Sequence, residues 1–457
     1  MDRAQPNILL ITCHDLGRYL GCYGHDIETP RIDELAASGS LFEQFYVSAP
    51  QCSPSRGSFM TGRYPHVNGL MGLAHSGWEL NDDERILPHY LQETAYETHL
   101  FGLQHITQDT DRLRYDHVHS EGNLYPGVSP SVHQANRAQN VASVVSTFLE
   151  KRAFDAPFLA TIGFFELHRV EEQNGRFGFD SGFYNADDPW DVTPLPYLPD
   201  QRGIRHDLGE MHGMVYAVDE ALATILDSLE MAGLDEDTLV IFTTEHGIAF
   251  PRAKGSCYDA GIEAAMIIRC PGLADDGTRY DELLSNVDVL PTILDLVDVD
   301  IPDVLNGKSF LPLLRNAADY SQRERIFAEM TWHDMYNPVR AVRTPRYKYI
   351  RNFWHLPEVY LTKDIFASES GRVIREQFGV PTRAYEELYD LREGPQEEEN
   401  VVNEPRYHDV RIELSRMLHE WMKETDDPLL AGPVNPGDFS TITEWPHSPA
   451  SEGPSDG

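Results

Sequence analysis

Lysine is scarce in this 457-residue chain, where only six of the 37 basic residues are lysines. The 74 Asp and Glu residues give a formal charge of −37. We therefore expect no nucleic-acid partner, because phosphate binding needs a basic patch. Acid-rich, lysine-poor surfaces suit high salt, where screening relieves self-repulsion. A halophilic source and an acidic mesophilic source are the two interpretations, and stability measured against KCl separates them.

The chain also lacks a cysteine framework and a long apolar run. Its five cysteines are odd in number and irregularly spaced, which argues against a disulfide-stapled secreted protein. No stretch approaches the roughly 18 apolar residues of a membrane helix. The first apolar run, residues 8–11, is too short for a signal peptide and has no basic leader. We expect a cytoplasmic protein with no membrane partner; a processed leader stays open.

Short apolar runs alternate with helical patterns over the first 325 residues or so. The expected strands are 7–12, 98–103, 157–164, 238–243 and 264–269, and the expected helices are 29–38, 87–95, 139–151, 208–231 and 287–296. This alternation predicts an α/β fold with a large, mainly parallel sheet covered by helices on both faces. Within 208–231, apolar side chains recur every three or four residues and predict a stripe that faces the core: Met211, Val215, Val218, Leu222, Ile225 and Leu229.

The pattern changes near residue 325. Runs at 326–330, 339–342 and 347–352 lie close enough in sequence to pair as an antiparallel sheet. A further strand at 388–391 and a last helix at about 407–423 follow. We predict a large domain over 1–325, a smaller C-terminal α+β subdomain over 326–430, and a flexible tail over 431–457, which is rich in Pro, Gly and Ser.

The most informative segment is residues 52–63, Cys-Ser-Pro-Ser-Arg-Gly-Ser-Phe-Met-Thr-Gly-Arg. Pro54 fits the first turn of a helix and Gly62 fits its end. Cys52 then lies at the helix N-terminus, where backbone N–H groups favour an anion, with Arg56 one turn further on. The segment predicts a nucleophile site for an anionic group. The alternative is an ordinary capped helix with a buried cysteine.

Cys-x-Pro-x-Arg followed by Thr-Gly-Arg-Tyr-Pro resembles the signature of type I sulfatases, in the alkaline phosphatase superfamily. The resemblance extends from about residue 6 to about residue 425, through the segments 6–24, 238–247, 340–350 and 387–391. Within the family, Asn-Gly-Leu-Met-Gly-Leu at 68–73 and Trp…Glu-Thr-x-Asp-Pro at 421–428 are most similar to the sulfamidases, the heparan N-sulfatase group.

This resemblance implies a hydrolase that removes sulfate from an ester or a sulfamate, with a small sulfated sugar as the expected substrate. In the family a separate formylglycine-generating enzyme oxidises the cysteine, so Cys52 is expected to become formylglycine. One hydroxyl of the hydrated aldehyde attacks sulfur to give a covalent sulfo-enzyme, and the other then expels sulfate. A divalent metal lowers the pKa of the attacking hydroxyl and neutralises sulfate oxygens. Arg56 is expected to hold the hydrate and its charge.

The resemblance also places the metal ligands after two strands. His14 and Asp15 follow 7–12, and Glu245 and His246 follow 238–243. The family usually has aspartates where His14 and Glu245 stand. Calcium, the family's usual ion, prefers oxygen ligands, whereas two imidazoles suit manganese or another transition metal better. The alternative for His14 is a hydrogen bond near the metal rather than ligation.

The remaining site residues come from four further segments. His105 ends a Gly-Lys-x-His-like motif in which Leu103 replaces the lysine, and it is the expected base for the second hydroxyl. His168 is expected to face the leaving group. Lys254 matches the family's second sulfate-binding cation, and Arg252 is expected to share that task as a substrate-binding residue.

His66, His75 and His333 lie in segments expected to ring the pocket, and each is expected to be structural rather than catalytic. His333 begins the smaller domain and lies in the expected substrate-specificity loop.

Two other functions stay open at this point. A phosphodiester or phosphonate monoester hydrolase of the same superfamily is favoured by the loss of lysine at Leu103 and by the histidine-rich metal site. A non-catalytic relative that binds sulfated glycans is disfavoured, because it would be expected to lose Cys52 or Arg56. The oligomeric state is open.

Overall fold

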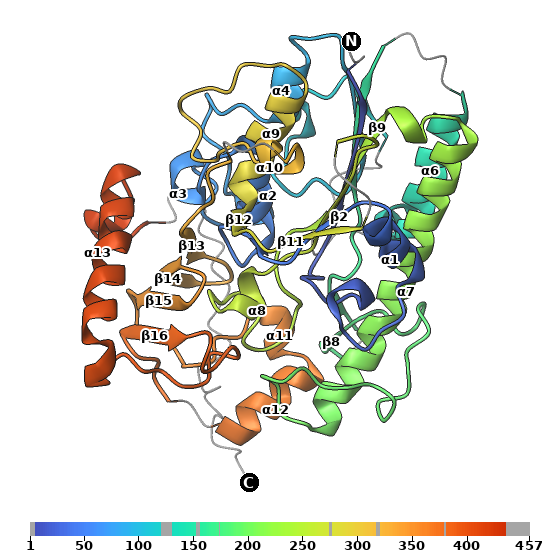
Figure 1. The fold of residues 1–457 in the computed structure, drawn as a ribbon. Coiled ribbons are helices and arrows are strands. Elements are labelled where there is room, and N and C mark those ends of the chain that lie inside the picture. The colour runs from blue at the N-terminus through green and yellow to red at the C-terminus, as the bar shows by residue number, and fades with distance from the viewer. Residues whose placement is uncertain are drawn as a thin grey trace.

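The largest layer of the molecule is an eight-stranded sheet with helices on both faces (Figure 1). The computed structural model describes residues 5–119, 130–151, 156–172, 174–273, 277–316, 320–378 and 381–435. Strand order is β11-β2-β10-β9-β1-β6-β4-β5. The bounds are β1 Asn7–Cys13, β2 Ser40–Phe42, β4 Glu97–Gly102, β5 His117–Val118, β6 Phe158–Gly163, β9 Thr238–Thr244, β10 Met266–Arg269 and β11 Thr278–Tyr280.

Most neighbouring strands run parallel, which confirms the predicted sheet. The pairs β9–β1, β1–β6, β6–β4 and β4–β5 are parallel. One strand is reversed: β10 pairs antiparallel with both β9 and β2. The five strands expected from the sequence are all present, each within about two residues of the expected ends.

Helices cover the two faces of this sheet (Figure 1). One face carries α1 (Pro30–Ala37), α6 (Ala138–Lys151) and α7 (Arg202–Met231), and the other carries α2 (Cys52–Thr61), α4 (Leu87–Leu91) and α9 (Val289–Leu296). The predicted stripe of α7 is fully buried, which confirms its role in the core. Helix α4 is shorter than expected: it ends at Leu91, whose carbonyl accepts a hydrogen bond from the Thr94 hydroxyl at 2.5 Å.

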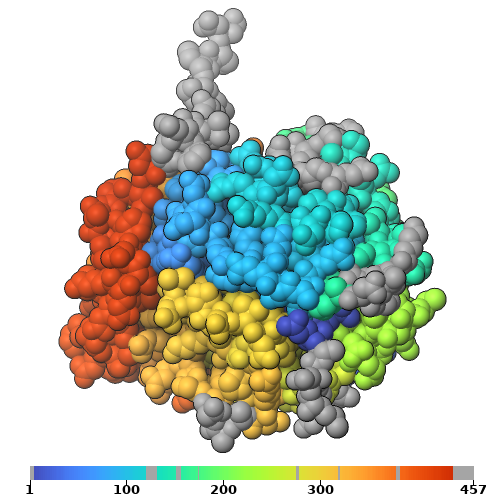
Figure 2. Space-filling model, turned by 90° about the horizontal axis from the view of Figure 1, so that it is seen from above, coloured from blue at the N-terminus to red at the C-terminus, as the bar shows by residue number. Residues whose placement is uncertain are grey.

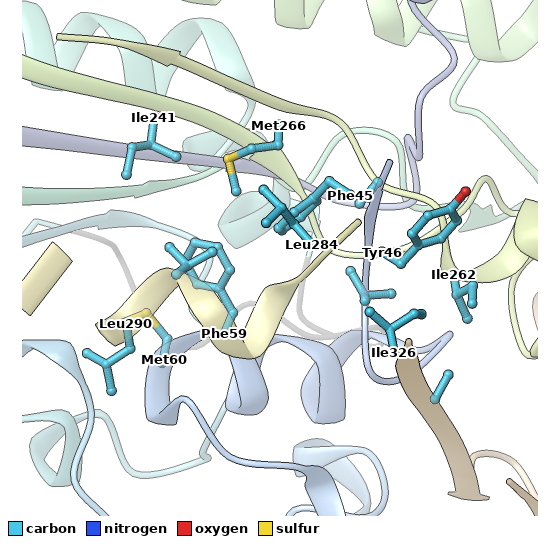
Figure 3. Packing of buried hydrophobic residues seen from close by; sticks show 14 of the residues in the cluster. Phe45, Tyr46, Phe59, Met60, Ile241, Ile262, Met266, Leu284, Leu290 and Ile326 are labelled. Atoms are coloured by element: carbon cyan, nitrogen blue, oxygen red, sulfur yellow. The ribbon is translucent and has the colours of Figure 1, made fainter. Parts of the chain in front are cut away.

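Helix α2 is held against the sheet by its apolar side. Phe59 and Met60 belong to one buried cluster with Ile241 of β9, Met266 of β10 and Leu290 of α9 (Figure 3). Every residue of α2 is buried. The first residue of this helix is therefore fixed relative to the strand ends.

The strand register determines where along the sheet each loop leaves its strand. In the β1–β9 pair, Cys13 lies opposite Thr244. Thr12 lies opposite Gly163 of β6, which in turn lies opposite Gly102 of β4. The chain thus leaves four neighbouring parallel strands at the same edge of the sheet, which is where open α/β folds place their ligands.

A second, antiparallel sheet lies beside the first. Its order is β13-β14-β15-β16, with bounds Ile326–Trp332, Tyr336–Arg343, Tyr347–Asn352 and Glu386–Asp390, and α13 (His408–Glu424) packs on it. In space-filling view the C-terminal helix runs along one side of the molecule (Figure 2). These strands confirm the predicted change of architecture, while the boundary at 325/326 stays a prediction. Residues 436–457 of the expected tail lie outside the described residues.

Several short helices were not predicted from the sequence, among them α11 (Lys363–Phe366) and α12 (Glu369–Phe378) in the C-terminal part. Within the described residues, no helix is both long and apolar enough to span a bilayer.

A buried ionic network ties the segment after α13 to the small sheet. The guanidinium of Arg340 on β14, with 0% exposure, contacts both oxygens of Asp427 at 2.5 and 3.1 Å. It also lies 3.1 Å from Glu329 of β13. Glu329 in turn contacts Nδ1 of His66 at 2.7 Å, so His66 has the structural environment that we expected.

Replacing Asp427 with Asn should destabilise the protein by about 3 kcal/mol, because the buried Arg340 loses a charge partner while the volume is unchanged. Urea unfolding measures this. Glu413→Gln, at an exposed position of α13, is the matched control and should stay within about 0.5 kcal/mol of wild type. Equal losses in the two variants would contradict the network's importance.

Candidate active site

Cys52 is the first residue of α2, as predicted. Gln51 before it is extended, and Gly62 ends the helix in the left-handed conformation at φ 66°. The Cys52 side chain is buried, with 2% exposure. The helix N-terminus therefore directs its N–H groups and its positive dipole end toward the place where the cysteine lies.

Four predicted metal ligands converge beside Cys52. Because Cys13 and Thr244 are register partners, His14-Asp15 and Glu245-His246 leave β1 and β9 side by side. One ligand atom from each of these four residues and the Cys52 Sγ all lie within 4.8 Å of one another. Nδ1 of His14 is 2.7 Å from Oε1 of Glu245, and Nε2 of His246 is 3.2 Å from both Glu245 Oε1 and Asp15 Oδ1.

In three of the four ligands, the polar atom that points away from the cluster forms a hydrogen bond with a neighbouring group. Lys254 Nζ donates to Asp15 Oδ2 at 2.8 Å, and Arg56 Nε donates to Glu245 Oε2. Nδ1 of His246 donates to the Gly247 carbonyl at 2.8 Å, so the neutral ring carries its lone pair on Nε2. Such outer contacts fix the orientation of metal ligands.

The four inward atoms are the ones without hydrogen bonds. His14 Nδ1, Asp15 Oδ1, Glu245 Oε1 and His246 Nε2 are buried, and none forms a hydrogen bond within the part of the chain that the structure describes. Two carboxylate oxygens and an imidazole lone pair repel one another at these distances unless a cation lies among them. The set therefore fits one divalent ion with mixed oxygen and nitrogen ligands.

The metal-free cluster has strongly shifted pKa values. Burial alone would lower the pKa of His246, but Cys52 and the Glu245 and Asp15 carboxylates raise it to about 9. Burial alone would raise the pKa of the Cys52 thiol, but His14 and Lys254 hold it well below its ordinary value. Among the cysteines of the described chain, Cys52 thus lies in the most electropositive environment.

His105 lies against Cys52 on the side of β4. Its backbone is left-handed at φ 52°, which turns the ring back toward the site. Burial lowers the His105 pKa, although a hydrogen bond with Cys52 opposes the shift. Its Nε2 is 3.0 Å from Nδ1 of His75, and the two rings stack. His75 therefore has a positioning contact that we did not assign from sequence.

His168 is close to the cluster but is held neutral. Its ring meets the ring of His14 edge-on, with centroids 4.6 Å apart. Nδ1 donates to the Arg169 carbonyl at 2.6 Å. Burial, followed by the charges of Lys254 and His14, lowers the His168 pKa to about 4. An imidazole in this state accepts a proton poorly and has none to give near neutral pH.

His333 reaches the site from the small sheet. It lies in the loop between β13 and β14, and its Nδ1 is 3.1 Å from Asp334 Oδ2. Burial lowers its pKa, but Asp334 and a hydrogen bond with Cys52 outweigh burial and raise the pKa to about 10. The structure thus brings this predicted specificity residue directly to the nucleophile position.

Lys254 joins the two parts of the molecule at the site. Its buried ammonium contacts Asp15 at 2.8 Å and Asp364 of α11 at 3.0 Å. Lys254 accordingly lowers the Asp364 pKa, despite the opposing effect of burial. Sequence reasoning missed Asp364, because a short helix 110 residues from Lys254 gives no local signal.

Arg252 is the one predicted site residue that the structure does not bring to Cys52. Its Nη2 donates to the carbonyls of Gln396 and Glu397 at 3.2 and 2.7 Å, and the guanidinium lies over the ring of Tyr258. Its backbone is left-handed, with φ at 66°.

Leu103 lies outside the ionic cluster, in an apolar cavity of about 30 Å³ behind it. Phe59, Ile106 and Leu113 line the same cavity, beside Arg56 and Glu245. A lysine at position 103 would bury its aliphatic stem here. The position at which the family usually has a lysine is therefore occupied by an apolar side chain in an apolar cavity.

Comparison with known proteins agrees with this geometry. The family model described as Sulfatase matches residues 6–299, and that described as N-sulphoglucosamine sulphohydrolase, C-terminal, matches residues 245–368. N-sulphoglucosamine sulphohydrolase of Homo sapiens is 29% identical over 94% of this chain and 93% of its own length.

Solved structures share the fold. A 2-O GAG sulfatase superimposes with a TM-score of 0.72 at 21% identity, over 93% of this chain and 94% of that one. A protein solved with its substrate D-glucosamine-2-N,6-O-disulfate gives 0.68 at 19% identity, over 93% and 98%. The Sulfatase match covers well over half of the sequence, from the first strand to the end of α9, and includes Cys52 and all four converging ligands. The chain belongs to the sulfatase family and is a sulfuric ester hydrolase.

Proposed function

We propose that this enzyme removes sulfate from a sulfated amino sugar of the N-sulfoglucosamine class, with Cys52, as formylglycine, as its nucleophile. The observation that carries the proposal is the buried Cys52 at a helix N-terminus, within 4.8 Å of four converging metal-ligand atoms. The N-sulphoglucosamine sulphohydrolase match over residues 245–368 supports the substrate class.

The ligand set supports one divalent ion. His14, Asp15, Glu245 and His246 would hold it. When bound, it would polarise sulfate oxygens and lower the pKa of the attacking hydroxyl. Two imidazoles with two carboxylates suit Mn²⁺ or another transition metal better than Ca²⁺. Arg56 and Lys254 act mainly by holding the outer oxygens of Glu245 and Asp15.

His333 is the group best placed to protonate the leaving atom. Its raised pKa, caused by Asp334 and Cys52 against the effect of burial, keeps it protonated at neutral pH. His168, which we expected in this role from sequence, has its pKa lowered to about 4 by burial and by Lys254. His168 instead packs edge-on against the ring of His14 and limits its movement.

The Lys254 ammonium has a third N–H donor that could bind the substrate anion. An ammonium group has three N–H donors, and its contacts with Asp15 and Asp364 use two of them. The third supports the anion-binding role that we expected from sequence. Arg252, committed to two carbonyls and the face of Tyr258, has a weaker claim on the substrate.

The buried position of Cys52 bears on maturation. At 2% exposure the thiol is out of reach of a second protein. We infer that the formylglycine-generating enzyme acts on the chain before it folds around α2.

Sulfate release by the metal-loaded enzyme tests the function. We expect turnover of N-sulfoglucosamine to exceed that of glucosamine 6-sulfate and of the matching phosphate monoester. Cys52→Ala should abolish turnover, whereas Cys270→Ala, a partly exposed cysteine elsewhere, should not. Preferred hydrolysis of the phosphate would overturn the proposal in favour of a phosphoester hydrolase.

Metal affinity should depend on pH. In the unmodified protein the His246 pKa, raised to about 9 by Cys52, Glu245 and Asp15 against burial, means that metal must displace a proton below that pH. Affinity for Mn²⁺ should therefore fall as pH is lowered from about 9 to 6. Calorimetry in buffers of different protonation enthalpy should detect proton release, and affinity that is constant over this range would contradict the assignment.

His333→Gln should lower kcat most for substrates with a poor leaving group and least for 4-nitrophenyl sulfate, because an acidic phenol leaves without a proton. In wild type, kcat for the poor leaving group should fall as the pH rises above neutrality and His333 loses its proton, because Asp334 raises the pKa of His333. Equal losses on both substrates would point to a structural role instead.

Lys254→Ala should lower kcat/KM by about 10- to 100-fold, the equivalent of a charge-assisted hydrogen bond of roughly 1.5–3 kcal/mol. Arg252→Ala is the matched comparison and should cost much less, because its guanidinium contacts Gln396 and Glu397. The reverse order would return the anion-binding role to Arg252.

A further inference from the structure

A second group of metal-binding side chains lies at the far edge of the large sheet. Glu97 and His99 are on β4, and His117 is on the neighbouring edge strand β5. One ligand atom from each of the three lies within 4.8 Å of the others. None of these residues belongs to the catalytic cluster, whose ligands follow β1 and β9.

The strand geometry explains why the three meet. Residues two apart on a strand share a face, so Glu97 and His99 point the same way. His99 and His117 are register partners in the parallel β4–β5 pair, and their rings stack with centroids 4.7 Å apart. The ring of His99 also contacts Phe148 of α6, which covers this face of the sheet.

The Glu97 carboxylate already lies between the two imidazoles. Its Oε1 is 2.8 Å from Nε2 of His117, and its Oε2 is 3.7 Å from Nε2 of His99. A tetrahedral ion bound at 2.0–2.2 Å to each ligand needs ligand atoms roughly 3.3 Å apart. The two observed separations lie on either side of that value, so small side-chain rotations would close the site.

His119 orients the buried ligand. Its Nε2 is 3.2 Å from Nδ1 of His99, and its ring stacks on Phe101 at a centroid separation of 4.2 Å. A metal-bound histidine commonly has its second ring nitrogen held in this way. Here the contact with His119 uses Nδ1 of His99, and Nε2 is the ring nitrogen that faces Glu97.

The cluster is open to solvent on one side and closed on the other. The side chains of Glu97 and His117 are 43% and 49% exposed, whereas that of His99 is 5% exposed. An ion would enter past the two exposed ligands and meet the buried imidazole. Water would complete its coordination from the open side.

We propose that Glu97, His99 and His117 form a second metal site, separate from the catalytic centre, for a borderline transition-metal ion such as Zn²⁺. Two imidazoles and one carboxylate suit this class of ion rather than Ca²⁺ or Mg²⁺. The bound ion would cross-link β4 to β5, a strand of two residues that ends the sheet. Its role is to fasten this edge, and catalysis does not need it.

Zinc stoichiometry in two backgrounds tests the proposal. Metal-free protein is dialysed to equilibrium against Zn²⁺, and bound zinc is measured by atomic absorption. Asp15→Asn weakens the catalytic cluster, and in that background His117→Gln should lower the zinc content by one ion per chain. His117→Gln alone should bind one zinc fewer than wild type. Because His117 is largely exposed, its replacement should leave the fold intact, which circular dichroism checks.

Control variants complete the experiment. Glu97→Gln should lose the same zinc as His117→Gln, while His419→Gln, on an exposed position of α13, should lose none. Zinc should raise the Tm of the Asp15→Asn variant more than that of the double variant. Sulfate release by His117→Gln should match wild type, so failure of the catalytic assignment would not affect this result. Equal zinc content in Asp15→Asn with and without His117→Gln would overturn the proposal.

Discussion

The structure depends on the convergence of four buried ionisable ligand atoms at the edge of the sheet. His14, Asp15, Glu245 and His246 direct two carboxylate oxygens and two ring nitrogens toward one point, away from water. Bringing such groups together is unfavourable without a cation, so a bound cation would complete this part of the fold. The outer contacts with Lys254, Arg56 and the Gly247 carbonyl follow from the same constraint, because each holds one ligand in its inward orientation.

The two parts of the molecule share this site. The large sheet supplies Cys52 and the four ligands, while the C-terminal part supplies His333 from a β-hairpin and Asp364 from α11. His333 carries the raised pKa and His168 the lowered one, although both are buried histidines. The difference comes from their partners: Asp334 faces His333, whereas Lys254 and His14 face His168. Asp334 thus favours the protonated form of His333, whereas burial and the charges of Lys254 and His14 favour the neutral form of His168.

Sequence patterns predicted the local features well. Short apolar runs predicted five of the eight strands of the central sheet, and a period-3.6 pattern predicted the buried stripe of α7. The Pro54–Gly62 pattern predicted the helix that begins at Cys52. The ligands that follow β1 and β9 were predictable for the same reason, since parallel strand ends meet at one edge. The role of Asp364 and the contacts of Arg252 could not be predicted, because both depend on packing between segments more than 100 residues apart. The leaving-group assignment to His168 came from a motif and stays a prediction, although burial and the charges of Lys254 and His14 lower the pKa of its ring.

The central claim is that the four converging atoms hold one divalent ion beside Cys52. Anomalous scattering from crystals soaked in Mn²⁺ and recorded near the manganese edge tests this most directly. We predict one strong peak among Nδ1 of His14, Oδ1 of Asp15, Oε1 of Glu245 and Nε2 of His246. The absence of a peak at this position in an active crystal would contradict the account.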